Sequence, residues 1–267
     1  MGVDIVPVLT KKQLKTFVKL PWKIYKNDPN WVPPLITMEM KRFDPKKNPY
    51  YLHSDVALFL AYKDGKPVGR ISAQIDHNFN EFQDVETAHF GFFESINDRE
   101  VAFRLLDTVS DWGRARGMKI LLGPLSFSTN DVAGLLVEDF KSPPRIMMSY
   151  NPPYYKELFE EYGFRKAKDL LAYDIIIDEK FKKFAEHLQR RLKPLAERAE
   201  SLGFRIRNID LKNVEPEIEK VKIIYNDAWE RNWGFVPMTD EEFEHLGKEL
   251  KQVAIPQLAK IVEYKGE

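Results

Sequence analysis

The chain of 267 residues has no cysteine. This lack excludes disulfides, thiolate nucleophiles and thiolate metal sites, and it fits a cytoplasmic protein. No apolar run approaches the roughly 18 residues that a membrane-spanning helix needs. The N-terminus, MGVDIVPVLTKK, lacks the charged start and apolar core that mark a signal peptide. Together these absences predict a cytoplasmic protein.

An excess of charge of either sign is also missing, because 41 Lys and Arg balance 41 Asp and Glu. A formal net charge of zero favours neither nucleic acid nor a membrane as a partner. The five histidines are scattered without the spacing of metal ligands, so we expect no metal. The chain does have 43% hydrophobic residues, enough for a core, and a length that predicts one large or two small domains.

The clearest element is a hairpin over 56–76, VALFLAYKDGKPVGRISAQID, in which two apolar runs flank the turn dipeptide Asp64-Gly65. Apolar periodicity and capping residues predict the other elements of this part of the chain. These are a strand at 3–9, a helix at 11–26 interrupted by Pro21, a helix at 35–43, a strand at 87–95, a helix from the cap Asp98 to Gly117, and a strand at 119–127.

The stretch NPPYYKELFEEYGF (151–164) predicts a further helix. Asn151 is suited to cap its first turn, and Tyr155, Leu158 and Phe159 begin an apolar stripe along it. Gly163 is suited to end the helix in a left-handed conformation, with Phe164 folded back onto the last turn. DLLAYDIII (169–177) then predicts a buried strand.

The order is strand, two helices, three strands, helix, strand, helix, strand. This order predicts an α/β (α+β) fold with a mixed central sheet and helices on both faces. A long helix follows at 179–203, kinked near Pro194, and then a strand and another helix. The sequence thus predicts a domain at 1–178, a connecting helix at 179–203 and a further segment at 204–267.

This order resembles that of the GNAT superfamily, the acyl-CoA-dependent N-acyltransferases. AYKDGKPVGRISAQI is similar to the family's second and third strands, and AFRLLDTVSDWGRARGMKILLG to the helix and strand after its cofactor loop. Asn151, Leu158-Phe159 and Gly163-Phe164 resemble its late helix. PWKIYKNDPNWVPP, GPLSFSTNDVAGLLVEDF and YNPPYY look like an uncharacterised prokaryotic branch. The resemblance implies a GNAT-like fold over 3–177 and acyl transfer from acetyl-CoA or a longer acyl-CoA, or from acyl-carrier protein, to the amine of a small molecule or peptide.

Two positions depart from the family pattern. The pyrophosphate loop, Q/R-x-x-G-x-G/A, corresponds to NDREVA (97–102), where only Ala102 conforms and Glu100 replaces a glycine. Phe159 stands where the family has its tyrosine general acid, and a phenyl ring donates no proton. These losses leave open a GNAT-like protein that binds a ligand or partner without catalysis. A Fem-type aminoacyl transferase, which also pairs two such folds, is a third possibility that a basic tRNA groove would mark.

If the chain is an enzyme, its base is His89, Glu94 or Glu86, and its general acid is Tyr154 at the edge of the apolar stripe. For each of these residues, packing or a solvated strand end is the competing explanation. The resemblance implies that backbone N–H groups near 92–94 polarise the thioester. The predicted cofactor-binding residues are Phe92, Phe93, Ser95, Asn97 and Arg99, and the predicted substrate-binding residues are Trp31, Ser128, Asn130 and Asn151.

The end of the chain repeats its beginning. VKIIYNDAWERNWGFVPMTDEEFEHL (221–246) is similar to PWKIYKNDPNWVPPLITMEMKRF (21–43), about 200 residues apart, as in an internal duplication. We therefore expect 204–267 to be the start of a second GNAT-like domain in a truncated form of a longer tandem protein. This segment would borrow the first domain's sheet or pair with another molecule, as in a homodimer.

Overall fold

The structure is a computed structural model that describes residues 2–250 and 255–266. It divides into two compact units, each described here by itself. The first unit comprises Met1–Ala167 with Ile224–His245, and the second comprises Lys168–Ile223 with Leu246–Glu267. The identity of 204–267 as the start of a second copy stays a prediction.

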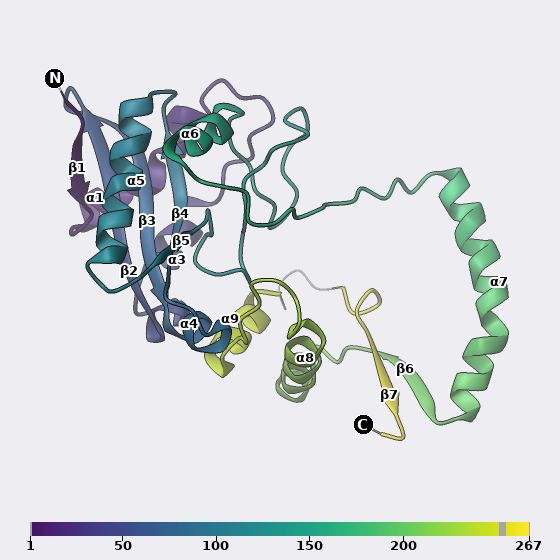
Figure 1. The fold of residues 1–267 in the computed structure, drawn as a ribbon. Coiled ribbons are helices and arrows are strands. Elements are labelled where there is room, and N and C mark those ends of the chain that lie inside the picture. The colour runs from purple at the N-terminus through teal and green to yellow at the C-terminus, as the bar shows by residue number, and fades with distance from the viewer. Residues whose placement is uncertain (1, 251–254, 267) are drawn as a thin grey trace. The chain divides into compact units, whose positions relative to one another are not determined.

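A five-stranded sheet forms the centre of the first unit, with the strands side by side in chain order (Figure 1). All neighbours are antiparallel except the last pair, which is parallel. The predicted mixed sheet, with 87–95 beside 119–127, is confirmed. The strands are β1 (Asp4–Pro7), β2 (Ser54–Lys63), β3 (Lys66–Asp76), β4 (Thr87–Ser95) and β5 (Ile120–Leu122).

Helices cover both faces of this sheet, as predicted. One apolar cluster packs α5 (Arg99–Arg114) and α6 (Tyr154–Tyr162) against Ile71 and Phe90. A second packs α1 (Lys11–Lys19) and α3 (Ile36–Arg42) against Leu60 and Phe92. Two short helices after β-strand or loop segments, α4 and the 3-10 helix η1, were not predicted. The elements are α1 (Lys11–Lys19), α2 (Pro21–Ile24), α3 (Ile36–Arg42), η1 (Pro49–Leu52), α4 (His77–Gln83), α5 (Arg99–Arg114) and α6 (Tyr154–Tyr162).

The local signals mostly act as expected. Asp64 and Gly65 have φ of 50° and 71°, which closes the β2–β3 hairpin. Gly163 ends α6 at φ 109°, and the ring of Phe164 lies 5.8 Å from that of Phe159. The capping role predicted for Asn151 is wrong, because α6 begins after Pro153 without a side-chain cap.

Residues 169–177, predicted as a buried strand, form no strand although the structure describes all of them. Leu171 is 75% exposed and Ile176 is 77% exposed. An apolar run becomes a strand only when a neighbouring strand accepts its backbone hydrogen bonds, and within the described residues this segment has no such neighbour. The sequence pattern reported the apolar run but not the missing neighbour.

The segment 224–245 joins the first unit through polar contacts. His53 lies between Asp76, at 3.1 Å from Nδ1, and Glu242, at 3.2 Å from Nε2. Thr129 and Asn130 donate to the backbone carbonyls of Gly234 and Val236. Burial disfavours a charged His53, but the hydrogen bonds of the two carboxylates outweigh burial and raise the pKa of His53 to about 9.

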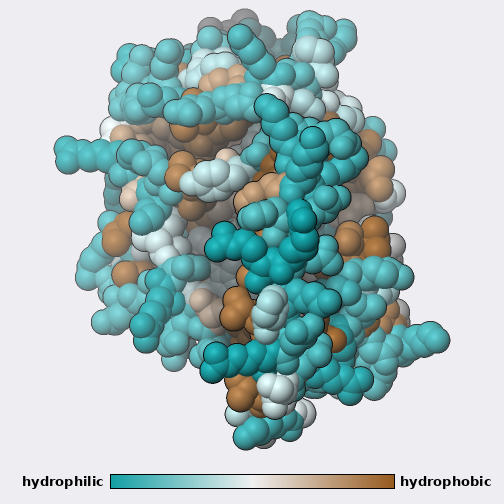
Figure 2. All heavy atoms as spheres, turned by 90° about the vertical axis from the view of Figure 1, so that its right-hand side faces the viewer, coloured by the Kyte–Doolittle hydropathy of each residue, from teal (hydrophilic) through white to brown (hydrophobic). Residues whose placement is uncertain are grey.

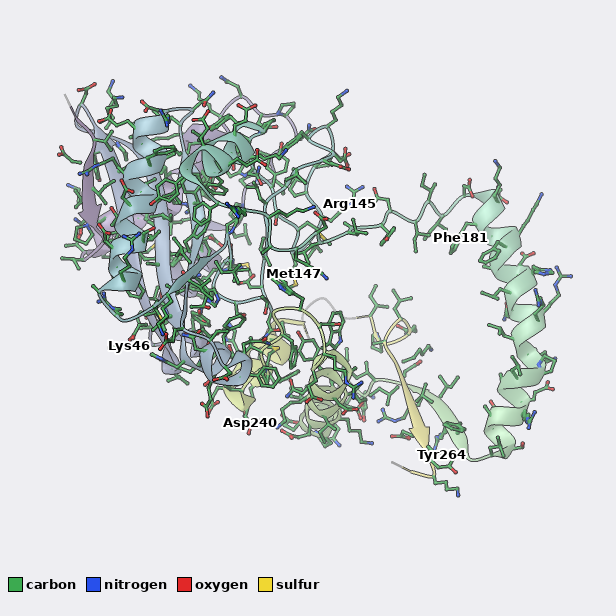
Figure 3. The ribbon with its side chains drawn as sticks, in the orientation of Figure 1. Lys46, Arg145, Met147, Phe181, Asp240 and Tyr264 are labelled. Atoms are coloured by element: carbon green, nitrogen blue, oxygen red, sulfur yellow. The ribbon has the colours of Figure 1, made fainter. Side chains whose placement is uncertain are left out.

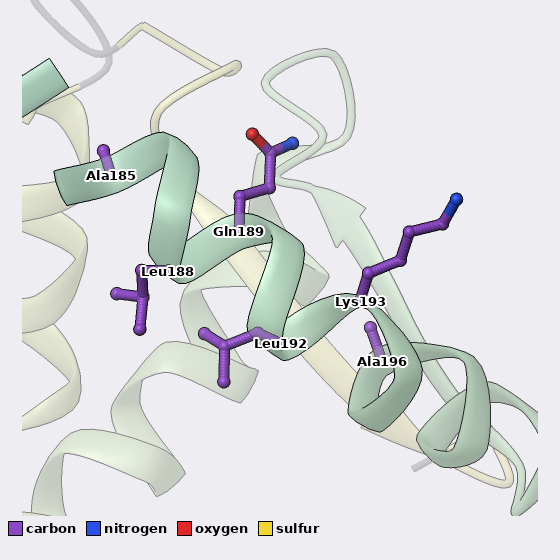
Figure 4. A pocket seen from close by; sticks show the side chains of 6 residues that line it. All are labelled: Ala185, Leu188, Gln189, Leu192, Lys193 and Ala196. Carbon is purple, nitrogen blue, oxygen red and sulfur yellow. The ribbon is translucent and has the colours of Figure 1, made fainter. Parts of the chain in front are cut away.

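The second unit contains a long helix and a two-stranded antiparallel pair. No residue of the helix α7 is buried, and Leu188 and Leu192 project from the same side of it (Figure 4). Apolar side chains are interspersed with hydrophilic ones on the face seen in Figure 2. Among the described residues, no helix has both the length and the apolar character needed to cross a bilayer. The remaining elements are α7 (Glu179–Ser201), β6 (Phe204–Asn208), α8 (Val214–Trp229), α9 (Asp240–Leu250) and β7 (Lys260–Tyr264).

Candidate active site

The strand β4 carries a bulge in its second half. Arg70 pairs with Glu94 and Ser72 with Gly91, so β4 places one residue more than β3 between these two pairs. Phe92, in the bulge, adopts a left-handed φ of 47°. A bulge leaves its extra residue outside the regular ladder and turns the strand. The bulge thus interrupts the regular ladder between Gly91 and Glu94.

The opening between β4 and the chain that follows β5 begins at Gly91. The Leu125 N–H still donates to the Phe90 carbonyl at 2.8 Å, and Gln74 Nε2 donates to the Leu125 carbonyl at 2.8 Å. A Cβ on residue 91 would lie 1.6 Å from the Leu125 carbonyl oxygen, so only glycine fits here. Phe92, Phe93 and Glu94 on one chain and Pro124 and Ser126 on the other help to line a cavity of about 110 Å³ in the first unit.

Glu94 is the acidic side chain of this cavity, and it is 8% exposed. Its Oε2 accepts hydrogen bonds from the Tyr25 hydroxyl at 2.9 Å and from the Tyr155 hydroxyl at 2.8 Å. Its Oε1 lies 3.7 Å from Arg70 Nη2. Burial raises the pKa of Glu94, while Arg70 and the two tyrosines work in the opposite direction. The result is a carboxylate more basic than an exposed one, with Oε1 free of tyrosine contacts.

Arg70 supplies a fixed positive charge beside Glu94. Its Nη1 donates to the Phe17 carbonyl at 2.9 Å, and its guanidinium lies 4.9 Å from the centre of the Phe17 ring. Within the described part of the chain, its buried Nε has no hydrogen-bond partner. Burial lowers the pKa of Arg70, but a guanidinium stays charged in proteins. The cavity therefore holds one positive and one negative group.

The two tyrosines at the start of α6 have different places. Tyr155 is 1% exposed, lines the cavity, donates to Glu94 and accepts from the Ser95 N–H at 2.8 Å. Tyr154, the predicted general acid, donates instead to the Ser95 carbonyl at 2.7 Å and does not line the cavity. Burial raises the pKa of Tyr154 to about 12. Phe159 packs at 4.9 Å from Phe93 and also lines the cavity.

Of the three candidate bases, only Glu94 lies at the cavity. His89 is 1% exposed, packs edge-on at 4.6 Å from Phe79, and has no hydrogen-bond partner for either ring nitrogen among the described residues. Burial lowers the pKa of His89 to about 4, so it is neutral near pH 7. Glu86 is exposed and forms an ion pair with Lys119. The geometry thus favours Glu94 over His89 and Glu86.

The predicted phosphate site at the start of α5 is already filled by the protein. The Asp98 carboxylate accepts from the N–H groups of Glu100 at 2.9 Å and Val101 at 3.3 Å, and Lys63 pairs with it at 2.6 Å. Asn97 and Arg99 are exposed on this turn. Two N–H groups that an anion would need, those of Glu100 and Val101, therefore already donate to a side chain.

The other predicted binding residues divide between the cavity and the surrounding packing. Phe92, Phe93 and Asn151 line the cavity, and Ser95 is buried next to it. Ser128 accepts from the Asn130 N–H at 3.1 Å, and Asn130 accepts from Tyr225 at 2.8 Å. Trp31 stacks on Tyr25 with ring centres 5.0 Å apart. Whether any of these residues contacts a substrate stays a prediction.

Sequence reasoning missed Arg70, Tyr25 and Tyr155 as members of the site. One signal was present for Arg70, because arginine at an inward position of an apolar hairpin strand is almost never buried without a partner. Tyr25 and Tyr155 come from segments 69 and 61 residues away from Glu94 along the chain. Their convergence is a result of the fold.

The predicted GNAT fold is confirmed by the sheet, whose four antiparallel strands are followed by a parallel fifth strand with helices on both faces. No family model matches the chain. It is 38% identical over 266 residues to a bacterial ceramide synthase of Caulobacter vibrioides, covering 99% of this chain and 67% of that protein. It is 34% identical to protein YghO of Escherichia coli, covering 96% of this chain and 63% of that protein. The chain thus spans about two thirds of the length of these relatives.

Similar solved structures include the aminoglycoside acetyltransferase AAC(6')-Iy in complex with a bisubstrate analogue of CoA. It is 16% identical, with a TM-score of 0.41, covering 66% of this chain and 99% of that chain. A putative acetyl transferase from Pyrococcus furiosus is also 16% identical, with a TM-score of 0.39, covering 66% of this chain and 100% of that chain.

Proposed function

The chain belongs to the family of the Caulobacter vibrioides bacterial ceramide synthase, and on this premise we propose that it transfers a fatty acyl group from a thioester to the amine of a long-chain amino lipid. A ceramide is the amide of a fatty acid and a long-chain amino alcohol. The reaction is therefore an N-acyl transfer, which agrees with the GNAT fold of the first unit. The name of the Caulobacter vibrioides relative, a ceramide synthase, supports a long-chain amino lipid as the acceptor.

Glu94 is the observation that carries this proposal. A buried carboxylate with a raised pKa, held by Tyr25, Tyr155 and Arg70 at a cavity, is suited to accept a proton from an attacking amine. Its Oε1 is the accepting atom in this scheme, since both tyrosines occupy Oε2. The tyrosines and Arg70 fix the orientation of the carboxylate and partly oppose the rise of its pKa that burial causes.

The proposed reaction proceeds by addition and elimination at the thioester carbonyl. The amine nitrogen forms a bond to the carbonyl carbon, and its proton passes to Glu94. The carbon–sulfur bond then breaks, and the proton leaves with the thiolate as a thiol. The bulge at Phe92 offers backbone N–H groups to the carbonyl oxygen as negative charge develops there, and Arg70 adds a positive charge nearby.

The turn at the start of α5, where Asp98 accepts two backbone hydrogen bonds, affects which acyl donor can bind. Asp98 occupies the N–H groups that would bind the pyrophosphate of coenzyme A, and Glu100 adds a second negative charge. A donor without that pyrophosphate, such as acyl-carrier protein, meets no such obstacle. We therefore propose acyl-carrier protein as the better donor and acyl-CoA as the weaker one, to be compared by kcat/KM with the same acyl chain.

The test of the function is product formation. The purified chain is incubated with a long-chain amino alcohol and either donor, and the amide is measured by mass spectrometry. Glu94→Gln keeps the shape and most hydrogen bonds but removes the base, and we expect about a hundredfold or larger loss of turnover. Glu86→Gln is the matched control, because Glu86 is an exposed glutamate directly before β4 that does not line the cavity. This variant should change turnover little. If amide formation is unchanged in Glu94→Gln, the assignment of Glu94 as the base is refuted. If no amide forms with either donor, the proposed acyl transfer is refuted, and a protein that binds a ligand without catalysis becomes the better explanation.

A further inference from the structure

One face of the first two helices carries a row of lysines. The helical path continues from α1 into α2, because Leu20 between them has helical angles of φ −60° and ψ −41°. At about 100° per residue, six lysines of α1, α2 and the turn after them fall within an arc of about 120°. All six are exposed, and none of them pairs with a carboxylate among the described residues. This lysine row comprises Lys11, Lys12, Lys15, Lys19, Lys23 and Lys26.

The opposite side of these helices is fixed in the core. Phe17 is 0% exposed, and Val18 and Leu20 are each 1% exposed. The ring of Phe17 packs edge-on at 5.2 Å from that of Phe43, which directly follows α3. The helices therefore keep their apolar side in the protein, and the lysine row is a polar surface about 20 Å long. A partner of this surface is held by charge.

Few acids accompany the lysine row in the sequence. No Asp or Glu occurs between Ile5 and Asn27, and residues 11–47 hold ten Lys and Arg against three acids. Each of the three acids has a partner: Asp28 accepts from the Tyr150 hydroxyl at 2.7 Å, Glu39 pairs with Arg42 at 3.6 Å, and Asp44 pairs with Lys47 at 3.5 Å. Lys46, also exposed, is labelled at the lower left of Figure 3. The neutral total charge, which predicted no membrane partner, averages over this positive region and a more acidic remainder.

The lysine row leads to the proposed active site. Tyr25, directly after α2, donates to Glu94 Oε2 at 2.9 Å, and Glu94 is the proposed base for the acceptor amine. The helix α5, whose first turn corresponds to the pyrophosphate loop of the family, packs on the opposite face of the sheet. The lysine row is therefore on the side of the acceptor and not on that of the acyl donor.

The composition of this face favours a fluid anionic surface over a protein partner. Interfaces between proteins are depleted in lysine and enriched in arginine and aromatic residues. The arc of the lysine row has six lysines, no arginine and one aromatic residue, Trp22, which is partly buried. An ammonium group is a point charge that does not require bidentate geometry. Such charges suit the phosphates of a bilayer, which move laterally.

We propose that the lysine row docks on the headgroups of an anionic phospholipid bilayer. The ammonium groups contact lipid phosphates, while the helices stay outside the acyl chains. This inference rests on the proposed function, because a long-chain amino lipid resides in a membrane and reaches Glu94 from the side on which Tyr25 lies. Docking holds this side of the first unit against the bilayer that contains the acceptor.

Flotation of the full chain with vesicles tests the docking. Vesicles of phosphatidylcholine alone should not bind the protein, whereas vesicles that also contain phosphatidylglycerol should bind it, and added salt should release it. The triple variant Lys15→Glu, Lys19→Glu and Lys23→Glu should bind about a hundredfold more weakly. Thermal unfolding of this variant should match that of the unchanged chain, because the three side chains are exposed.

A matched control changes the total charge by the same amount on the opposite face of the sheet. It reverses three exposed arginines on or just after α5: Arg104→Glu, Arg114→Glu and Arg116→Glu. This control variant should bind vesicles nearly as well as the unchanged chain, because salt screens charges that are distant from the bilayer. Lys15→Arg, Lys19→Arg and Lys23→Arg should also retain binding, because they keep the charge of the row.

Three outcomes would overturn the proposal. The first is no binding to vesicles that contain phosphatidylglycerol, and the second is an equal loss of binding in the lysine-to-glutamate variant and the control variant. The third is binding of acyl-carrier protein that depends on the lysine row, without binding to vesicles, which would assign this face to the acyl donor. None of these measurements requires turnover, so a failure of docking is distinct from a failure of the proposed acyl transfer.

Discussion

Two antiparallel strand pairs of this protein differ in their surroundings. In the pair β1–β2, Asp4 lies opposite Tyr62, and in the pair β6–β7, Phe204 lies opposite Tyr264. Each second strand reaches a Tyr-Lys dipeptide shortly before a glycine, Tyr62-Lys63 before Gly65 and Tyr264-Lys265 before Gly266. The pairing agrees with the proposed duplication, in which these two tyrosines correspond.

The two strand pairs differ in how far their apolar side chains are buried. Leu60, opposite Val6, is 0% exposed, whereas Val262, at the corresponding place opposite Ile206, is 57% exposed. β2 lies between two strands and under helices on both faces, but β7 pairs only with β6 among the described residues. The neighbours of a strand pair thus decide whether its apolar side chains are buried.

Amide exchange should show the largest difference between the two pairs. The amides of β2 open only when the sheet unfolds, whereas those of β7 open with a single two-stranded ribbon, so we expect β2 to exchange about a thousandfold more slowly. Hydrogen exchange read by mass spectrometry on peptides from each strand measures this difference. Equal protection of β7 would mean that the second unit is stabilised by contacts beyond those of the described residues.

Truncation of the corresponding side chains should give the next largest effect. Leu60→Ala leaves a cavity in a packed core, and we expect it to lower the free energy of unfolding by about 2–5 kcal/mol. Val262→Ala removes exposed methyl groups and should cost less than about 0.5 kcal/mol. Urea unfolding of both variants makes the comparison, which fails if the two losses are similar.

The pH dependence of stability should differ by a smaller amount and with a definite sign. The pKa of His53 is about 9 in the folded chain against 6.5 ordinarily, so its contribution is fully present below pH 6.5 and is lost as pH rises through 9. His53→Gln should remove this alkaline loss from the unfolding of the first unit. A wild-type curve that is flat between pH 6.5 and 9.5 would contradict the ion pairs with Asp76 and Glu242.

The ion pairs of β7 should give the smallest effect, at the opposite end of the pH scale. Hydrogen bonds from Lys220 and Arg207 lower the pKa of Glu263, so its stabilisation is present above its ordinary pKa of 4.5 and is lost as pH falls through the lowered value. Glu263 is partly exposed, so solvent weakens its ion pairs, and we expect Glu263→Gln to change only the protection of β6 and β7 in mild acid. Acid-dependent exchange of β1 and β2 that follows this substitution would show coupling between the units.

The sequence was informative where one segment determines its own conformation. The Asp64-Gly65 hairpin, the Asp98 cap and the Gly163 ending were predicted because each depends on residues within a few positions. The strand at 169–177 was predicted wrongly because a strand also needs a partner, which the pattern of one segment does not report. The helix α4 was missed although Asp76 accepts from the Phe79 N–H at 3.1 Å, a capping signal of the ordinary kind.

The candidate site was less predictable for the same reason. Glu94 could be proposed from its place on β4, but the choice between it and His89 depended on burial and on partners distant in sequence. The same holds for Tyr154 and Tyr155, adjacent residues on one helix that differ in which group each hydroxyl reaches. Such choices are made by packing across the sheet, and only the folded chain reports them.

The Asp98 cap has a consequence for regulation. Free coenzyme A, ATP and other nucleotides share the phosphate groups that GNAT enzymes grip at the start of this helix, and they are abundant in cells. A protein that closes this turn with its own carboxylate offers them fewer N–H groups. If the proposed acyl transfer takes place here, free coenzyme A should therefore inhibit it only weakly.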